Sequence, residues 1–138
     1  MATKYVLDAC ALFAFIYKET GFDVVRSILK QTSDGDVDVF MNKLNLFEVF
    51  YVIRRTEGLQ TAEGVYDTVI KLPIQTINGI SDDVFFEASR IKSLHKMSLA
   101  DSIALGEASI MGASLITADH HEFDVVEQKE DIKFTWIR

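Results

Sequence analysis

Short runs of β-branched and aromatic residues alternate along this chain with longer segments whose apolar residues repeat at helical spacing. The short runs predict strands at residues 3–8, 37–41, 74–77, 114–117 and 133–137. The longer segments predict helices at residues 9–17, 20–31, 42–57, 61–72, 81–95 and 98–112. Strands separated by helical crossovers indicate a central, mostly parallel sheet with helices on both faces, an α/β sandwich. The segment between the last two strands is interpreted as a loop.

Capping residues mark the boundaries of several predicted helices. The expected N-caps are Thr20, Asn42, Ser81 and Ser98. Gly58 is expected to stop the helix that Asn42 begins. No internal repeat, low-complexity tract or linker divides the chain, so we expect residues 1–138 to form one domain.

The composition fits one soluble domain in a reducing compartment. With 138 residues and 49% hydrophobic content, the chain can bury roughly two-thirds of its unfolded surface. The single cysteine, Cys10, excludes an intrachain disulfide, so we expect a cytoplasmic protein. Asp8 interrupts the first apolar run and no apolar run reaches ~18 residues, which argues against a signal peptide and a membrane span. The net charge of −7 argues against a protein that coats nucleic acid, but it does not exclude a nuclease.

Four carboxylates stand nearly alone in apolar stretches. They are Asp8 in YVLDACALFAFIY, Glu48 in LNLFEVFYVI, Asp101 in MSLADSIALG and Asp119 at the end of ASLITAD. An ionised carboxylate in apolar surroundings is costly unless it gains a cation, takes up a proton or lies at the wet end of an element. Parallel strands place their carboxyl ends at one edge of the sheet, and early helical turns face the same edge, so we expect the four to meet there. Four oxygen ligands in one place indicate a divalent cation, Mg²⁺ or Mn²⁺.

Each of these acids also has a structural interpretation. Asp8 has the position of an N-cap for the helix that follows it. Ser98 and Asp101 have the spacing of a capping box, and a capping role can coexist with a ligand role. Asp119 is also typical of an acid in a turn after a strand. Glu48 is the hardest to explain in this way, because apolar residues surround it at nearly every helical offset.

Four motifs, in order, resemble those of PIN-domain ribonucleases, and closely those of the compact VapC-type toxins of prokaryotic toxin–antitoxin pairs. The motifs are VLDACALFAF, NLFEV, SLADSIAL and LITADHHEF, and the resemblance covers the whole chain. It implies a PIN-like three-layer fold and an endoribonuclease that uses Mg²⁺ or Mn²⁺, with the four acids as metal ligands and catalytic residues. It also implies a type II system in which a separate antitoxin blocks the acidic cleft. The sequence departs from the family at Cys10 and Asn45, where hydroxyl residues are frequent.

Three further residues are candidates for supporting roles at such a site. Asn45 and Thr117 are candidates for hydrogen bonds to metal ligands or metal-bound water, although β-propensity alone also explains a threonine in a strand. Glu122 is a candidate for a further carboxylate, with a solvated loop residue as the simpler interpretation. The neighbouring His120 and His121 are interpreted as exposed loop histidines.

Basic and aromatic residues suggest partners. One candidate group for RNA phosphates is Arg54 and Arg55, and another is Arg90, Lys92, His95 and Lys96. Both groups lie near predicted helix C-termini, so complementing the helix dipole explains them at least as well. The aromatic residues of the first and third predicted helices exceed what one small core needs, which indicates a homodimer surface there.

Two other classes of function stay open on the sequence alone. The first is a catalytically idle PIN module that binds RNA or protein, although decay of activity usually deletes one of the acids. The second is a phosphatase or receiver-like phosphoryl-transfer domain, which also gathers acids at strand ends. A haloacid-dehalogenase-like phosphatase usually has Asp-x-Asp after its first strand, whereas Ala9 and Cys10 follow Asp8 here.

Overall fold

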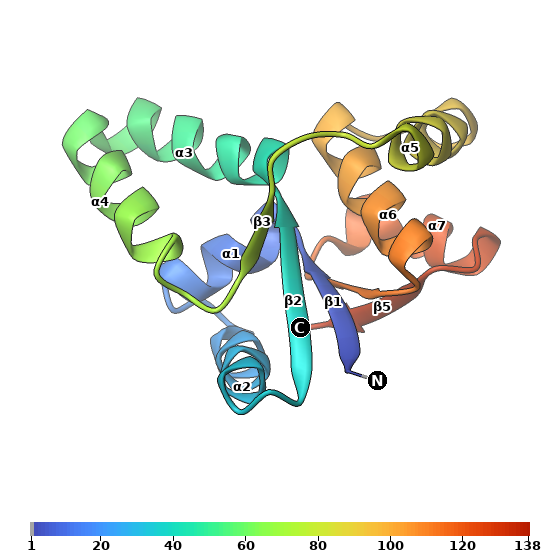
Figure 1. Cartoon of the computed structure of the whole chain (residues 1–138). Coiled ribbons are helices and arrows are strands. Elements are labelled where there is room, and N and C mark those ends of the chain that lie inside the picture. The colour runs from blue at the N-terminus through green and yellow to red at the C-terminus, as the bar shows by residue number, and fades with distance from the viewer. Residues whose placement is uncertain (1) are drawn as a thin grey trace.

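Parallel strands form one five-stranded sheet at the centre of the computed structural model, which describes residues 2–138 (Figure 1). The strands are β1 (Thr3–Leu7), β2 (Val37–Asn42), β3 (Gln75–Ile77), β4 (Ser114–Thr117) and β5 (Lys133–Trp136). Their order is β3-β2-β1-β4-β5, and every neighbouring pair is parallel. The predicted α/β sandwich around a parallel sheet is therefore confirmed.

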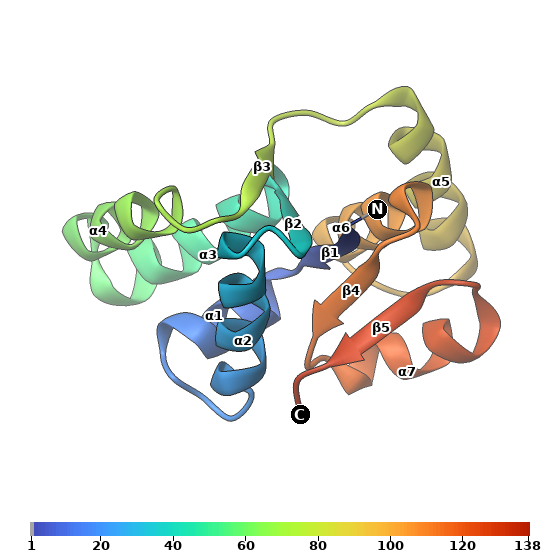
Figure 2. The ribbon, with the colours of Figure 1, turned by 60° about the horizontal axis from the view of Figure 1, so that its bottom comes forward.

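Helices cover both faces of this sheet, as Figures 1 and 2 show from two directions. One face carries α1 (Ala9–Ile16), α2 (Phe22–Ser33), α3 (Lys43–Glu57) and α4 (Leu59–Val69). The other face carries α5 (Asp82–Leu94), α6 (Leu99–Met111) and α7 (His120–Lys129). Across residues 2–138, no helix has both the length and the apolar character needed to cross a membrane.

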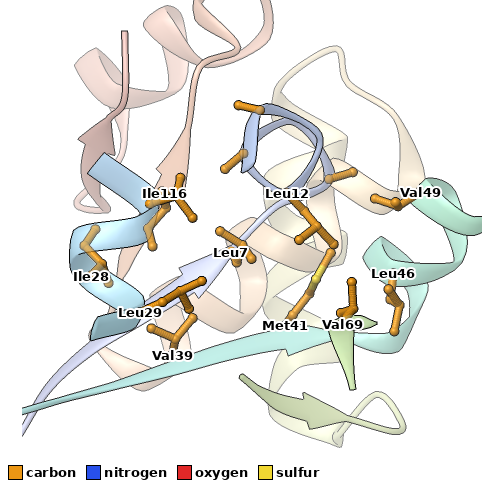
Figure 3. Packing of buried hydrophobic residues seen from close by; sticks show 14 of the residues in the cluster. Leu7, Leu12, Ile28, Leu29, Val39, Met41, Leu46, Val49, Val69 and Ile116 are labelled. Atoms are coloured by element: carbon orange, nitrogen blue, oxygen red, sulfur yellow. The ribbon is translucent and has the colours of Figure 1, made fainter. Parts of the chain in front are cut away.

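Two apolar cores fix the helices to the sheet. The first lies on the α1–α4 side, where Leu7 of β1 and Met41 of β2 pack with Leu12 of α1 and Val49 of α3 (Figure 3). The second lies on the opposite side and is built around the fully buried side chains of Leu105, Leu115 and Phe123. Close packing on both faces holds the first turns of the helices in fixed positions at the carboxyl edge of the sheet.

The chain reverses its direction across the sheet between β1 and β4. From β1 it proceeds outward through β2 to β3, and it then returns to β4 on the other side of β1. Leu7 pairs with Ile116, so β1 and β4 end beside each other. Open parallel sheets bind ligands at the carboxyl ends of strands at such a switch point. Asp8 follows the end of β1, and Asp119 lies two residues beyond the end of β4.

Three of the four predicted N-caps are confirmed. Asn42, Ser81 and Ser98 each accept a hydrogen bond from a backbone amide in the first turn of their helix. The prediction of Thr20 as an N-cap is wrong, because α2 begins after Gly21 without a side-chain cap. Gly21 has a φ of 102°, and a Cβ there would lie 2.8 Å from side-chain atoms of Ile137, so only glycine fits.

One helix was missed, and several predicted boundaries differ from the structure by one to three residues. Helix α7 occupies a segment that was interpreted as a loop. The sequence has only a weak helical pattern there, because Phe123 and Val126 are the buried residues of this helix. Helix α4 begins at Leu59 rather than at residue 61, and it ends at Val69 rather than at residue 72. Gly58 ends α3 and immediately precedes α4, which leaves no connecting loop between them.

Candidate active site

All four isolated carboxylates line one open cleft of about 780 Å³ at the carboxyl edge of the sheet. Asp8 is the N-cap of α1, Glu48 lies in the second turn of α3, Asp101 in the first turn of α6, and Asp119 is the N-cap of α7. Helices from both faces of the sheet therefore contribute to the same cleft. The sequence predicted this meeting of the acids, while their role as metal ligands stays a prediction.

Asp8 is the most strongly buried of the four, with 2% of its surface exposed. Its Oδ1 accepts a hydrogen bond of 2.8 Å from the backbone amide of Ala11, so it caps α1 as one interpretation of the sequence predicted. Burial raises its pKa from 3.8 to about 7. Hydrogen bonds from Thr117 and Ala11 oppose this rise, and the negative charges of Asp101 and Asp119 add to it.

Glu48 and Asp101 line the cleft from helices on opposite sides of the sheet. Burial raises the pKa of both groups, that of Asp101 to about 6. Each also experiences the negative charge of Asp119, and Asp101 experiences that of Glu48. Ser98 Oγ accepts a hydrogen bond of 3.1 Å from the backbone amide of Asp101, which places Asp101 at the start of α6. The carboxylate of Asp101 lines the cleft as well.

Asp119 and Glu122 approach the cleft from the first turn of α7. Asp119 Oδ1 accepts the backbone amide of Glu122 at 3.2 Å, and Glu122 also lines the cleft. Asp119 lies in the short connection between β4 and α7, as predicted, but Glu122 lies in α7 and not in a loop. The sequence did contain a signal, since an aspartate followed three residues later by a glutamate has the spacing of a capping box.

Thr117 and Asn45 form hydrogen bonds with the acids or with residues next to them. Thr117 is fully buried, hydrogen-bonds to the carboxylate of Asp8, and accepts the backbone amide of Asp119 at 3.1 Å. Asn45 is also buried, and its Nδ2 donates to the carbonyl of Ala100 at 3.0 Å. This bond joins α3, which carries Glu48, to the residue that precedes Asp101. The Oδ1 of Asn45 has no hydrogen-bond partner among the residues that the structure describes.

Cys10 lines the cleft beside the acids, and its surroundings disfavour the thiolate form. Burial, and then the charge of Asp8, raise the pKa of its thiol to about 11. A thiol with that pKa is uncharged at neutral pH, and the thiolate is the nucleophilic form.

The two histidines after Asp119 lie outside the cleft lining. The ring of His120 stacks on Trp136 with 3.8 Å between centroids, and its Nδ1 lies 2.7 Å from Oδ1 of Asp124. His120 is exposed, as predicted, but it lies in α7 and not in a loop. His121 is exposed, and its interpretation as a surface residue holds within α7.

The two candidate basic groups differ in their availability. Arg90 pairs with Glu87 and Glu130, each at 2.8 Å, and Lys92 donates to the carbonyl of Met97 at 2.8 Å. These side chains are engaged in contacts within α5 and between α5 and the segments at Met97 and Glu130. Arg55, in contrast, lies over the ring of Tyr51, 5.2 Å from its centroid, and Tyr51 lines the cleft.

The donors of the cleft fit a hard divalent cation. Six carboxylates line it, those of Asp8, Glu19, Glu48, Asp101, Asp119 and Glu122, and within residues 2–138 no lysine or arginine does. Over the same residues, no three acidic, histidine or cysteine side chains have the spacing of an assembled metal site. Mg²⁺ is usually held by one or two carboxylates, together with waters and substrate phosphate oxygens. Oxygen donors in a wide, open cleft suit that mode of binding.

Residues 5–129 match the PIN domain family. The chain belongs to this family. No protein of curated function matches its sequence significantly.

Solved structures share the PIN fold over nearly the whole chain. VapBC2 from Rickettsia felis, bound to a DNA fragment from its promoter, has a TM-score of 0.75 at 12% identity and covers 96% of this chain and 98% of its own. DNA-bound VapBC from Salmonella typhimurium has a TM-score of 0.73 at 16% identity, with 99% of each chain covered. VapC20 from Mycobacterium tuberculosis, a toxin that cleaves the sarcin–ricin loop, has a TM-score of 0.62 at 13% identity and covers 88% of this chain and 94% of its own. At these identities the likeness shows a shared fold.

The raised pKa of Asp8 predicts that the metal-free PIN domain loses folding stability as the pH rises. Because the folded state holds this proton to about pH 7 and the unfolded chain only to about 3.8, stability falls as the pH rises through that window. Asp8→Asn removes the charge and keeps a capping side chain. In EDTA at pH 8, we expect the variant to unfold at a higher temperature than wild type. The gain in stability should be at most roughly 4 kcal/mol, since the shift spans about three pKa units and each corresponds to about 1.4 kcal/mol.

Thermal unfolding followed by circular dichroism at pH 4 and pH 8 measures this difference. The gain should disappear at pH 4, and Asp131→Asn, an exposed aspartate outside the cleft, serves as the matched control. An Asp8→Asn variant that is no more stable than wild type at pH 8 would contradict the predicted cost.

Proposed function

We propose that this protein is a Mg²⁺- or Mn²⁺-dependent endoribonuclease and the toxin of a type II toxin–antitoxin pair. The observation that carries the proposal is the meeting of four carboxylates in one cleft of a PIN-domain chain. The shared fold with VapBC proteins, and with a toxin that cleaves the sarcin–ricin loop, supports RNA as the substrate. We take residues 1–138 as one nuclease domain that acts in the cytoplasm.

Asp8, Glu48, Asp101 and Asp119 are the proposed ligands of one or two ions. A bound ion supplies a water of lowered pKa and stabilises charge on the scissile phosphate. Thr117 orients two of the ligands. Its side chain hydrogen-bonds to the carboxylate of Asp8 and accepts a hydrogen bond from the backbone amide of Asp119. Asn45 holds the helix of Glu48 against the start of α6, and Glu122 adds negative charge at the rim. The chain's own contribution is to hold several carboxylates near one another in partly dehydrated positions.

RNA cleavage tests this proposal directly. We expect wild-type protein to cleave single-stranded RNA with Mg²⁺ or Mn²⁺ and to stop in EDTA. Asp8→Asn, Glu48→Gln and Asp101→Asn should each lose more than about 100-fold in activity, since even residues that only orient ligands typically contribute 10–100-fold. Double substitutions should cost little more than single ones, because the acids act as one unit.

Circular dichroism must show that each variant remains folded, and Asp131→Asn provides a control with the same change of charge. RNA binding without cleavage by wild type would favour the idle PIN module. Turnover of a phosphomonoester instead of RNA would favour a phosphatase. Full activity of Asp101→Asn would remove Asp101 from the ligand set and leave it as a residue of the helix start.

A cognate antitoxin is the proposed protein partner. The similar structures from Rickettsia felis and Salmonella typhimurium are VapBC structures bound to DNA. A separate antitoxin that covers the acidic cleft would keep the proposed nuclease inactive. Co-expression of the neighbouring gene product and co-purification with this chain would support the pair.

We also propose that the protein is a homodimer, with the exposed aromatic pair of α5 as the contact in place of the surface of α1 and α3 that the sequence suggested. Phe13, Phe15 and Phe50 of α1 and α3 pack against the core. Phe47 of α3 exposes 60% of its surface, and the neighbouring Phe85 and Phe86 of α5 expose 58% and 70%. Exposed apolar side chains in such a cluster often mark a protein interface.

Light scattering at micromolar concentration measures the mass in solution. We expect twice the chain mass of 15.6 kDa for wild type and the chain mass for Phe86→Glu, which introduces a charge at the proposed contact. Tyr17→Glu, at the end of α1, is the matched control and should stay dimeric. A wild-type mass of 15.6 kDa would reject the dimer.

A further inference from the structure

Beyond the four acids, the cleft continues along the seam between α1 and α3. Asp8 begins α1 and Tyr17 ends it, a distance of about 13 Å at a rise of 1.5 Å per residue. Phe13 and Tyr17 line the cleft from this helix, and Tyr51 lines it from α3. The hydroxyl of Tyr17 donates to the carboxylate of Glu57, which joins the C-terminal ends of the two helices. The acids lie at one end of the seam and this bridge lies at the other.

The aromatic rings of the seam are held in position by their neighbours. Tyr17 stacks on Phe13 with 6.2 Å between centroids, and Tyr51 contacts Phe47 at 5.7 Å. Tyr51 and Tyr17 nevertheless expose 37% and 46% of their surfaces, so they are not core residues. The guanidinium of Arg55 lies over the ring of Tyr51, one helical turn further along α3.

The charge of the cleft restricts how a nucleic acid can bind there. The lining carries six carboxylates, and the whole chain has a net charge of −7, so the surface does not attract phosphates by its general field. Stacking of a base on an aromatic ring requires no positive field and accepts any base. Over residues 2–138, Arg55 forms no ion pair with a carboxylate, so its charge is available for a phosphate beside the ring.

We propose that Tyr51 and Arg55 form the binding site for the nucleotide next to the cleaved bond. The base stacks against the exposed part of the Tyr51 ring, and Arg55 contacts the flanking phosphate. This inference rests on the proposed ribonuclease function and makes it more specific. A base can reach the seam only when it is unstacked, so the substrate is single-stranded RNA, a loop or a bulge, and not a continuous duplex.

Steady-state cleavage of a short single-stranded RNA with Mn²⁺ tests the site. Tyr51→Ala should raise KM roughly 10-fold, within the range that loss of one base–aromatic stack produces, and kcat should change much less. Tyr51→Phe keeps the ring and should restore the wild-type KM. Arg55→Ala should raise KM and weaken its dependence on salt. Arg26→Ala removes the same charge from α2 and should leave KM unchanged.

Quenching of 2-aminopurine placed next to the cleavage site reports stacking itself, independently of turnover. Wild-type protein should quench the fluorescence of the single strand and not of a duplex, and Tyr51→Ala should abolish the quenching. Equal KM and equal quenching for Tyr51→Ala and wild type, with cleavage intact, would overturn this site and leave the nuclease proposal standing. Failure of wild type to cleave or to bind RNA would overturn both.

Discussion

The cost of holding charged carboxylates close together, with little water around them, dominates this structure. Asp8 is nearly inaccessible, and two of its neighbours in the cleft carry the same charge. Hydrogen bonds from the start of α1 and from Thr117 favour the ionised form, but burial outweighs them and the pKa rises to about 7. Proteins seldom keep such a group without a cation or a function that needs it. A divalent ion bound in the cleft would relieve the repulsion and compensate for the dehydration.

Two of these carboxylates, and the backbone of a third, also fix the starts of helices around the cleft. Asp8 and Asp119 cap α1 and α7, and the backbone amide of Asp101 is bound by Ser98 at the start of α6. Capping and ligand roles do not compete, because a carboxylate has two oxygens and a cap uses one. Such a carboxylate would therefore keep an oxygen for a metal ion while it caps its helix.

Much of this arrangement could be predicted from the sequence because its signals are local. Strand runs, N-caps such as Asn42, and single acids in apolar segments each lie within a few residues of one another. Helix α7 was missed because only two of its apolar residues are buried, too few to produce a helical pattern. Contacts between distant segments also could not be predicted, such as the pairing of Arg90 with Glu130, which occupies a side chain that seemed free to bind RNA. The link from Asn45 to the carbonyl of Ala100 crosses 55 residues and depends on the packed fold in the same way.

The position of an ion in the cleft is the most direct test of the idea that the four acids form one metal site. Crystals of the wild-type chain soaked in Mn²⁺, measured where manganese scatters anomalously, locate the ion without any assay of activity. The anomalous density should show one or two peaks about 2.1 Å from oxygens of Asp8 and at least one of Glu48, Asp101 and Asp119. Crystals of Asp8→Asn should lose them. Peaks confined to the outer surface, with none in the cleft at millimolar Mn²⁺, would contradict the metal site.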